Sequence, residues 1–573
     1  MNILKRKYSI LAVSCLAGIL LISCNFLDFD ESERLYDKET VFTNYSQTTN
    51  LLNNLYSYLQ QDFGVLGEGA MRACATDDAE YADPNNPVQD INNGNWSPLN
   101  VKDDVFAYMY TGIRAANNFI INYNDSSYLD FKYDSDYPKW ADAFKYYHYE
   151  ARALRAYMYF ELAKRYGDVP LYTDVLTIEE ANAIGKTSFE EVVDFIIKES
   201  DAVIDFLPYS YLDTKNPETG RVTKGFAMAL KSRALLYAAS PLHNESGDSK
   251  KWEKAAKASL AIIDSVRLKN WYVKELGASA VNNFNSKEII LFKNNTNSSE
   301  FERFNFPVRF TAGNSSRAGI CPTQNLVDAF ETENGYPVTL TNTGWISDDP
   351  DFNPQNPYSN RDPRFYQTVL YNGAQFKGQE IETFMGGEDE GSVTSGGTAT
   401  GYFLNKYILE DVNFTPGSIV SKPHYWVIFR YGEILLNYAE AMLGAFNNPD
   451  YTDGVYTMSA REAINIVRTA ATMPSISESN PESFIKLIRN ERRVELAFED
   501  HRFWDIRRWK IGASTQKDIY GVQIVINNDN KIYNKYKYET RSWSEKMNLY
   551  PINQFEIYKN RNLEPQNPGW SQN

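Results

Sequence analysis

Apolar residues recur every three or four positions along much of this chain, and this period predicts a mainly α-helical fold. The clearest series is Trp140, Phe144, Tyr147, Ala151, Leu154, Met158 and Leu162. Residues at this spacing lie on one side of a helix and form a single apolar stripe. The helix is expected to end at Gly167, which tolerates a left-handed backbone, shortly before Pro170 prevents its continuation.

The same pattern predicts further helices, in residues 188–207, 224–239, 252–266, 429–445, 459–472 and 482–509. Ser188 is a suitable N-cap for the first of these, and small residues such as Ala227 and Ala234 allow close contact between neighbouring helices. Consecutive helix pairs of this kind predict a tetratricopeptide-like scaffold. The spacing of the pairs is irregular, and no strict 34-residue period is present.

Two long stretches interrupt the helical pattern. The scaffold is expected in residues 40–61, 101–270 and 429–510, and the excursions from it in residues 62–100 and 271–428. Long loops within a helical domain are more often functional than accidental. A few short strands are also expected, among them a β-hairpin in residues 521–538.

The N-terminus resembles a bacterial lipoprotein signal. Lys5, Arg6 and Lys7 precede a 13-residue apolar run, which is too short for a membrane-spanning helix. The run ends in Leu21-Ile22-Ser23-Cys24, which resembles a lipobox. We therefore expect a signal peptide in residues 1–23 and lipid on Cys24, with more than one acyl chain needed for durable anchoring.

Composition excludes some classes of function. The chain has 573 residues and a net charge of −16, which argues against a nucleic-acid partner. Only four histidines are present, so histidine catalysis and zinc sites are disfavoured. Cys74 and Cys321 are the cysteines outside the N-terminal segment, and the sequence leaves open whether they pair. The 40 tyrosines suit either helix packing or a surface that stacks on a ligand.

Motifs for catalysis and metal binding are incomplete. Lys186-Thr187 resembles the end of a phosphate loop, but Glu180 stands where its first glycine is required. Asp349, Asp351 and Asn353 resemble the start of a calcium loop that lacks its turn glycine and closing glutamate. No residue is nominated as a nucleophile, and no cofactor or metal is expected.

Residues 488–509 contain the densest cluster of charges. Both signs alternate there, and Trp504 and Trp509 are suited to packing against guanidinium groups, so we interpret the cluster as structural rather than as an anion site. Arg493 is expected to neutralise Glu491 or Glu495.

Several segments in order along the chain resemble the SusD/RagB family of outer-membrane lipoproteins. They are residues 150–170, which end in Tyr166-Gly167-Asp168-Val169-Pro170, residues 224–241, Arg430-Tyr431-Gly432-Glu433 with the residues to 441, residues 465–468 and 488–509, Tyr550-Pro551-Ile552 and Asn567-Pro568-Gly569. The chain departs from the family pattern at Gly432 and Asp500. The resemblance covers most of residues 24–573, which it implies form one SusD-like domain.

The resemblance implies a cell-surface protein that binds oligosaccharides and delivers them to a TonB-dependent transporter of the SusC kind. RagB-like members of the family bind peptides, so peptide uptake remains an alternative. A surface glycosidase is a second alternative, disfavoured by the absence of a catalytic motif. The shared motifs belong to the scaffold and leave the ligand open.

Candidate ligand-binding residues come from the excursions, where aromatic side chains stand near polar ones. The candidates are Arg72, Asp77, Asp78, Tyr81, Asn95 and Trp96 in the first excursion and Phe292, Asn294, Phe304, Phe306, Arg317 and Trp345 in the second. Each aromatic residue is about as suited to the core as to a binding platform. Trp96 lies among turn-forming residues, where a large aromatic is either buried or held out for stacking, and the nearby Asn95, Asp77, Asp78 and Tyr81 favour stacking on a sugar.

Overall fold

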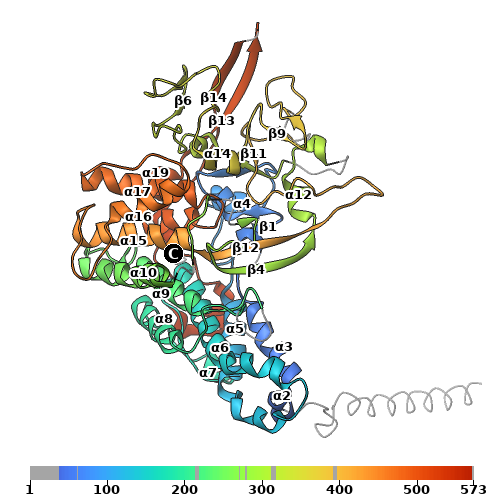
Figure 1. Cartoon of the computed structure of the whole chain (residues 1–573), viewed down its shortest axis with the longest axis vertical. Helices are drawn as coiled ribbons and strands as arrows, with labels where there is room; N and C mark the ends of the chain where they lie inside the picture. The colour runs from blue at the N-terminus through green and yellow to red at the C-terminus, as the bar shows by residue number, and fades with distance from the viewer. Residues whose placement is uncertain are drawn as a thin grey trace, which may run out of the picture.

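The computed structural model describes residues 38–60, 62–212, 218–269, 272–277, 281–311, 318–390, 397–528 and 530–570. The protein is mainly α-helical, as predicted, and its helices form a scaffold from which loop-rich segments and a long hairpin project (Figure 1). The expected signal peptide, Cys24 and Arg317 lie outside the described residues.

The first part of the scaffold is a series of antiparallel helices. It comprises α2 (Lys38–Thr43), α3 (Tyr45–Tyr56), α5 (Phe106–Asn122), α6 (Tyr137–Tyr166), α7 (Ile178–Ala181), α8 (Phe189–Ile204), α9 (Lys224–Ala239) and α10 (Ser249–Lys269), with α4 (Val88–Asn92) in the first excursion. Neighbours in this series pack on one another: α5 on α6, α6 on α8, α8 on α9 and α9 on α10.

Local capping explains where these helices begin and end. Ser188 and Glu191 form a capping box at the start of α8, as its sequence predicts. α6 ends at Gly167, whose φ of 70° is unfavourable for other residues. The apolar stripe of α6 is buried along its whole length, which confirms the predicted helix and its inward face.

The second part of the scaffold packs on the first through α15. It comprises α15 (Tyr431–Phe446), α16 (Ala460–Ala470), α17 (Pro481–Glu495) and α18 (Arg502–Arg508). α15 contacts α9 and α10 on one side and α16 and α17 on the other. The apolar pattern of residues 482–509 predicted continuous helix, but the structure has a break between α17 and α18. Phe498 and Asp500 both have a φ of 61° at this break.

The remaining helices are short: α12 (Glu300–Asn305), α13 (Gln324–Val327), α14 (Pro363–Thr368), α19 (Gly512–Thr515) and α20 (Gln554–Lys559).

Within the described residues the strands form antiparallel pairs: β1 (Val65–Gly67) with β2 (Ala70–Met71), β3 (Ala79–Tyr81) with β5 (Ile320–Pro322), β4 (Ile289–Ser298) with β12 (Lys422–Arg430), β6 (Thr339–Thr341) with β7 (Gly344–Ile346), β8 (Val369–Leu370) with β11 (Phe403–Leu404), β9 (Gln375–Phe376) with β10 (Gln379–Glu380), and β13 (Asp518–Asn527) with β14 (Asn530–Thr540).

The predicted hairpin is confirmed and is longer than expected. β13 and β14 pair from Asp518 opposite Thr540 to Asn527 opposite Asn530, and the hairpin extends away from the helices (Figure 1). The β3–β5 pair joins the two excursions to each other, because Glu80 lies opposite Cys321. Cys74 and Cys321 are both buried free thiols.

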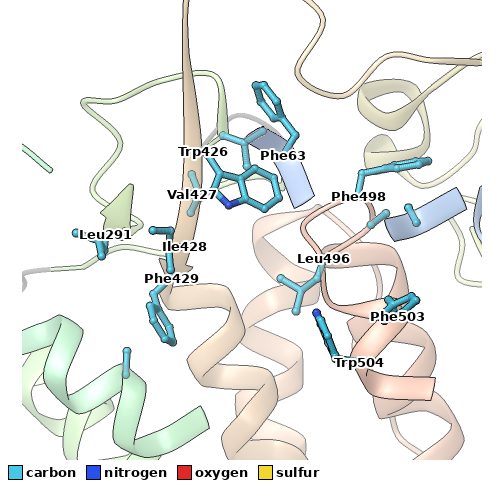
Figure 2. Packing of buried hydrophobic residues seen from close by; sticks show 14 of the residues in the cluster. Phe63, Leu291, Trp426, Val427, Ile428, Phe429, Leu496, Phe498, Phe503 and Trp504 are labelled. Atoms are coloured by element: carbon cyan, nitrogen blue, oxygen red, sulfur yellow. The ribbon is translucent and has the colours of Figure 1, made fainter. Parts of the chain in front are cut away.

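The core continues from the scaffold into the excursions. β12 leads directly into α15, and Trp426 points from it toward the connection between α17 and α18, whereas Phe429 packs on Phe226 of α9 (Figure 2). Phe63, from the first excursion, lies against Trp426 with ring centroids 5.7 Å apart. A strand of the second excursion and a turn of the first are therefore held against the helices by one apolar cluster.

The charge cluster of residues 488–509 is a buried ion-pair network. Arg508 binds Glu440 at 2.6 Å, and Arg492 binds Asp505 at 2.8 Å. Trp504 packs under Arg165, with 4.8 Å between the guanidinium carbon and the ring centroid. The structural interpretation of this segment agrees with these contacts.

The prediction that Arg493 neutralises Glu491 or Glu495 was wrong. Arg493 binds Asp78 through Nε at 2.6 Å and Asp77 through Nη2 at 3.1 Å, so it joins α17 to the first excursion. Glu491 is instead neutralised by Arg364 and Arg468. The prediction failed because α17 faces segments that are distant in sequence, and their charges are better placed than its own neighbours.

Candidate functional site

A cavity of about 510 Å³ lies where the two excursions meet. Three segments form its walls: the turn leading into β1, the outer half of β4 with α12, and the start of β12. Its lining residues are Phe63, Val65, Gly69, Asn294, Asn295, Thr296, Ser298, Glu300, Phe301, Phe304, Asn305 and His424.

The strand pair places polar side chains along one wall. β4 and β12 are antiparallel, with Asn294 opposite Tyr425 and Asn295 opposite His424. Asn294 is exposed and Asn295 half-buried, and within the described part of the chain neither side-chain amide has a hydrogen-bond partner. Each amide therefore has donor and acceptor capacity left for a ligand.

A short helix supplies the aromatic wall. Phe301 and Phe304 are three residues apart on α12, so both point to the same side. Phe301 is buried against Phe63, with ring centroids 4.4 Å apart, whereas Phe304 is 37% exposed. Phe304 therefore presents part of its ring to the cavity, while Phe301 fixes the helix beneath it.

Glycine at position 69 permits the close approach of Phe304. Gly69 has a φ of +85°, and a Cβ atom there would lie 3.1 Å from Cγ of Phe304 and 2.8 Å from the hydroxyl of Tyr81. That hydroxyl donates a 2.8 Å hydrogen bond to the carbonyl of Glu68. The turn is thus held in place by Tyr81, and a side chain at position 69 would displace the aromatic wall.

A buried hydrogen bond between His424 and Glu302 closes the base of the cavity. Nε2 of His424 is 2.8 Å from Oε1 of Glu302, and the backbone N–H of Leu409 donates to the same oxygen at 3.1 Å. The His424 ring also packs edge-on against Phe63, with centroids 5.7 Å apart. His424 and Glu302 are both buried, so the imidazole is held in one orientation.

Two of the predicted ligand residues, Asn294 and Phe304, line this cavity together. Tyr81 supports it from behind, as described above. Phe292 is buried against Tyr425 and lines a separate cavity of about 280 Å³. Asn95 is exposed and is not among the lining residues of either cavity.

Three other aromatic candidates are buried. Trp96 is 2% exposed and packs edge-on against Tyr550 and Trp570, with centroid separations of 5.1 and 4.8 Å. This burial contradicts the expectation that Trp96 stands free for stacking, because the turn around it directs the indole inward. Phe306 and Trp345 are also in the core, where Phe306 packs on Phe376 and Trp345 on Tyr358.

The charged candidates of the first excursion are occupied by ion pairs. Arg72 binds Asp103 at 2.7 Å, and Asp77 binds Arg502 at 2.8 Å. Although burial raises the pKa of Asp77, Arg493 and Arg502 outweigh it and lower that pKa to about 2. These residues connect the excursion to the scaffold and leave no free charge for a ligand.

The lining residues that the sequence did not nominate include Phe63, Asn295, Glu300, Phe301 and His424. Asn295, Glu300 and Phe301 lie within ten residues of two nominated positions, so a wider window around Asn294 and Phe304 would have included them. His424 carries no local motif and reaches the cavity only through the β4–β12 register.

The described residues contain no group of three or more His, Cys, Asp or Glu side chains that is arranged to hold a metal ion. Asp349, from the incomplete calcium motif, accepts hydrogen bonds from the Asn334 side chain and the Asp351 backbone instead. No helix in the described ranges is both long and apolar enough to cross a membrane.

Comparison with known proteins assigns the chain to a family. A profile described as the SusD family matches residues 287–570, and a second, described as starch-binding associating with outer membrane, matches residues 25–236. This chain belongs to the SusD/RagB family. Comparison with curated proteins finds no match.

Solved structures of SusD-like proteins share the fold. A SusD-like protein from Bacteroides fragilis is 29% identical, with a TM-score of 0.75 over 93% of this chain and 98% of that one. A SusD-like carbohydrate binding protein from the same species is 25% identical, with a TM-score of 0.71 over 92% and 100%. Surface glycan-binding protein A from Bacteroides uniformis is 21% identical, with a TM-score of 0.62 over 91% and 99%, and supports the fold alone.

Proposed function

We propose that this protein binds oligosaccharides in the 510 Å³ cavity and delivers them to a TonB-dependent transporter of the SusC kind in the outer membrane. The observation that carries the proposal is the partly exposed Phe304 ring beside the amides of Asn294 and Asn295, which have no side-chain partner among the described residues. Sugars combine an apolar C–H face with a rim of hydroxyl groups, so they need both kinds of contact at once. Relatives that bind carbohydrate support the same assignment.

The arrangement suits binding without catalysis. Two carboxylates lie near the cavity, but Glu302 is fully buried and accepts hydrogen bonds from His424 and Leu409. This leaves Glu300 as the carboxylate that lines the cavity, whereas glycoside hydrolysis requires a pair that flanks the scissile bond. We therefore propose a binding protein rather than a glycosidase.

The proposed location is the cell exterior, with the protein anchored to the outer membrane through lipid on Cys24. The lipobox-like sequence supports this location, as does the outer-membrane association in the description of the matching profile. The acidic surface of the chain fits a protein that binds neither nucleic acid nor anionic lipid directly.

The Phe304→Ala variant tests the proposal. Loss of the stacking surface is expected to weaken oligosaccharide binding by about 1–3 kcal/mol, by analogy with base–aromatic stacking. Stability is expected to change by less than about 1 kcal/mol, because the ring is partly exposed. Calorimetry against neutral oligosaccharides of glucose, mannose and xylose measures the first quantity, and thermal unfolding the second.

Phe555→Ala is the matched control, because Phe555 is 60% exposed on α20 and does not line the cavity. Its binding should equal that of the unmodified protein. Equal binding by the Phe304→Ala variant would contradict the proposed site. Binding of peptides in place of oligosaccharides would contradict the proposed ligand class.

A further inference from the structure

His424 has one ring nitrogen that the protein does not use. Its Nε2 faces Glu302, whereas Nδ1 has no hydrogen-bond partner among the described residues. The residue is 5% exposed and lines the cavity. Some side-chain atoms of the protein are fully buried without a hydrogen-bond partner, and Nδ1 of His424 is not one of them. An imidazole that is almost wholly buried thus retains one polar atom that remains accessible at the cavity.

The surroundings of Glu302 define the role of that atom. Oε1 of Glu302 accepts the Leu409 N–H and faces Nε2, so the hydrogen between the two side chains belongs to His424. In the neutral ring, an Nε2–H group leaves a lone pair on Nδ1. Nδ1 is then an acceptor, and its natural partner is a hydroxyl group of the ligand.

The charged groups near the cavity also bear on which ligands it accepts. Glu300 contributes a carboxylate to the lining, and no Lys or Arg occurs among the described lining residues. The nearby Arg303 is 3.3 Å from Glu300, and Lys293 reaches the carbonyl of Ser57 at 3.5 Å. At Nδ1, a carboxylate or sulfate of a ligand would meet a second acceptor instead of a donor, in a protein whose net charge is already −16.

We infer that His424, oriented by Glu302, determines the specificity of this site: its Nδ1 accepts a hydrogen bond from a ligand hydroxyl, so the site selects neutral glycans over glycans that carry a carboxylate or sulfate at that position. The inference rests on the proposed oligosaccharide binding and names the chemical class of the ligand. His424 is the contact residue, and Glu302 is a positioning residue that acts through it.

A matched pair of substitutions tests the role of Nδ1. In His424→Gln, the amide reaches the Nε2 position beside Glu302 and leaves the Nδ1 position empty, whereas in His424→Asn the amide lies close to the Nδ1 position. Binding of neutral hexasaccharides should weaken roughly fivefold to tenfold in the Gln variant and change less than about threefold in the Asn variant. Equal loss in both, or in neither, would overturn the role of Nδ1.

The unmodified protein provides a second test that does not depend on variants that fold. Calorimetry with hexagalacturonate should give at least tenfold weaker binding than with neutral hexasaccharides, and the preference should persist in high salt because acceptor groups face the ligand directly. The protein has only four histidines, so the ¹⁵N resonance of His424 Nδ1 can be followed as a neutral hexasaccharide is added. Its position should show an unprotonated nitrogen that shifts on binding.

The outcomes separate this inference from the proposed function. Tighter binding of hexagalacturonate than of every neutral hexasaccharide, or an Nδ1 resonance unaffected by a ligand that binds, would overturn the selectivity while leaving glycan binding intact. Failure of both neutral and acidic oligosaccharides to bind would overturn the proposed function, and the inference with it.

Discussion

Two polar regions of the protein use their side chains in opposite ways. In residues 488–509, charged groups are directed inward and end on buried partners, as Arg508 does on Glu440 and Arg492 on Asp505. In the segment formed by β4 and α12, Asn294 and Asn295 have no side-chain partner within the described residues, and the Phe304 ring is partly exposed. Charged residues are dense in the first region and make up a smaller share of the second.

The difference shows that charge density is a poor guide to a ligand site in this fold. Buried polar groups are nearly always hydrogen-bonded, so a dense charged segment inside a scaffold is expected to satisfy itself. A ligand site instead needs polar groups that the protein leaves free beside exposed apolar surface. This criterion supports the cavity between the excursions as the proposed site and places the charge cluster in the scaffold.

The largest expected effect comes from Arg430, at the junction of β12 and α15. It is 1% exposed and binds Glu288 at 2.5 Å, Glu495 at 2.6 Å and Glu499 at 2.6 Å. Arg430→Ala would leave these carboxylates without their shared cation and should lower the free energy of unfolding by roughly 5 kcal/mol or more. Urea unfolding measures the change, and loss of soluble protein would be its extreme form.

Arg561→Ala is the control for that experiment. The Arg561 side chain is 66% exposed and pairs with Glu564 at 2.9 Å on the surface. Its removal should cost less than about 1 kcal/mol, because solvent screens an exposed ion pair. Similar losses for the two variants would mean that the network around Arg430 is open to solvent, and the contrast between the two regions would disappear.

A smaller effect is expected for Trp96, which the sequence placed at the ligand and the structure places in the core. Its contacts with Tyr550 and Trp570 bring the first excursion against the C-terminal segment. Trp96→Ala should lower the free energy of unfolding by about 3–5 kcal/mol through lost burial and a cavity. Below its unfolding temperature the variant should bind oligosaccharides as the unmodified protein does.

Thermal unfolding and calorimetry on the same Trp96→Ala preparation separate the two roles. Unchanged stability together with weakened binding would return Trp96 to the ligand, and would show that both excursions contribute free aromatic surface.

The helices could be predicted because their determinants are local. A period of 3.6 residues, a capping box at Ser188 and a terminating glycine at position 167 all lie within the helices they define or next to them. The break before α18 was missed because it depends on Phe498 and Asp500, non-glycine residues that adopt positive φ angles. A positive φ is uncommon for any residue other than glycine and is an outlier for a bulky residue such as Phe498, so the local sequence does not predict the break.

The site could be predicted only in part, because it is assembled from distant segments. Its walls come from residues near 65, near 300 and at 424, and the register that places His424 opposite Asn295 is set by the whole β4–β12 pair. The separation of interacting segments along the sequence also explains the wrong predictions. Asp77 and Asp78 look free in the sequence until Arg493 and Arg502 reach them from the scaffold.

The smallest effect, and the sharpest test of the contrast, compares two exposed asparagines. Asn294 lines the cavity, whereas Asn95 lies in the first excursion and does not, and the structure shows no side-chain partner for either within the described residues. Asn294→Ala should weaken oligosaccharide binding by about 1 kcal/mol, roughly fivefold, because one hydrogen-bonding group is lost without effect on the core. Asn95→Ala should leave binding unchanged, and both variants should unfold at the temperature of the unmodified protein. Calorimetry under identical conditions measures the pair. Weaker binding by Asn95→Ala with normal binding by Asn294→Ala would move the ligand to the first excursion, and would mean that unpartnered amides beside an exposed ring do not identify the site in this protein.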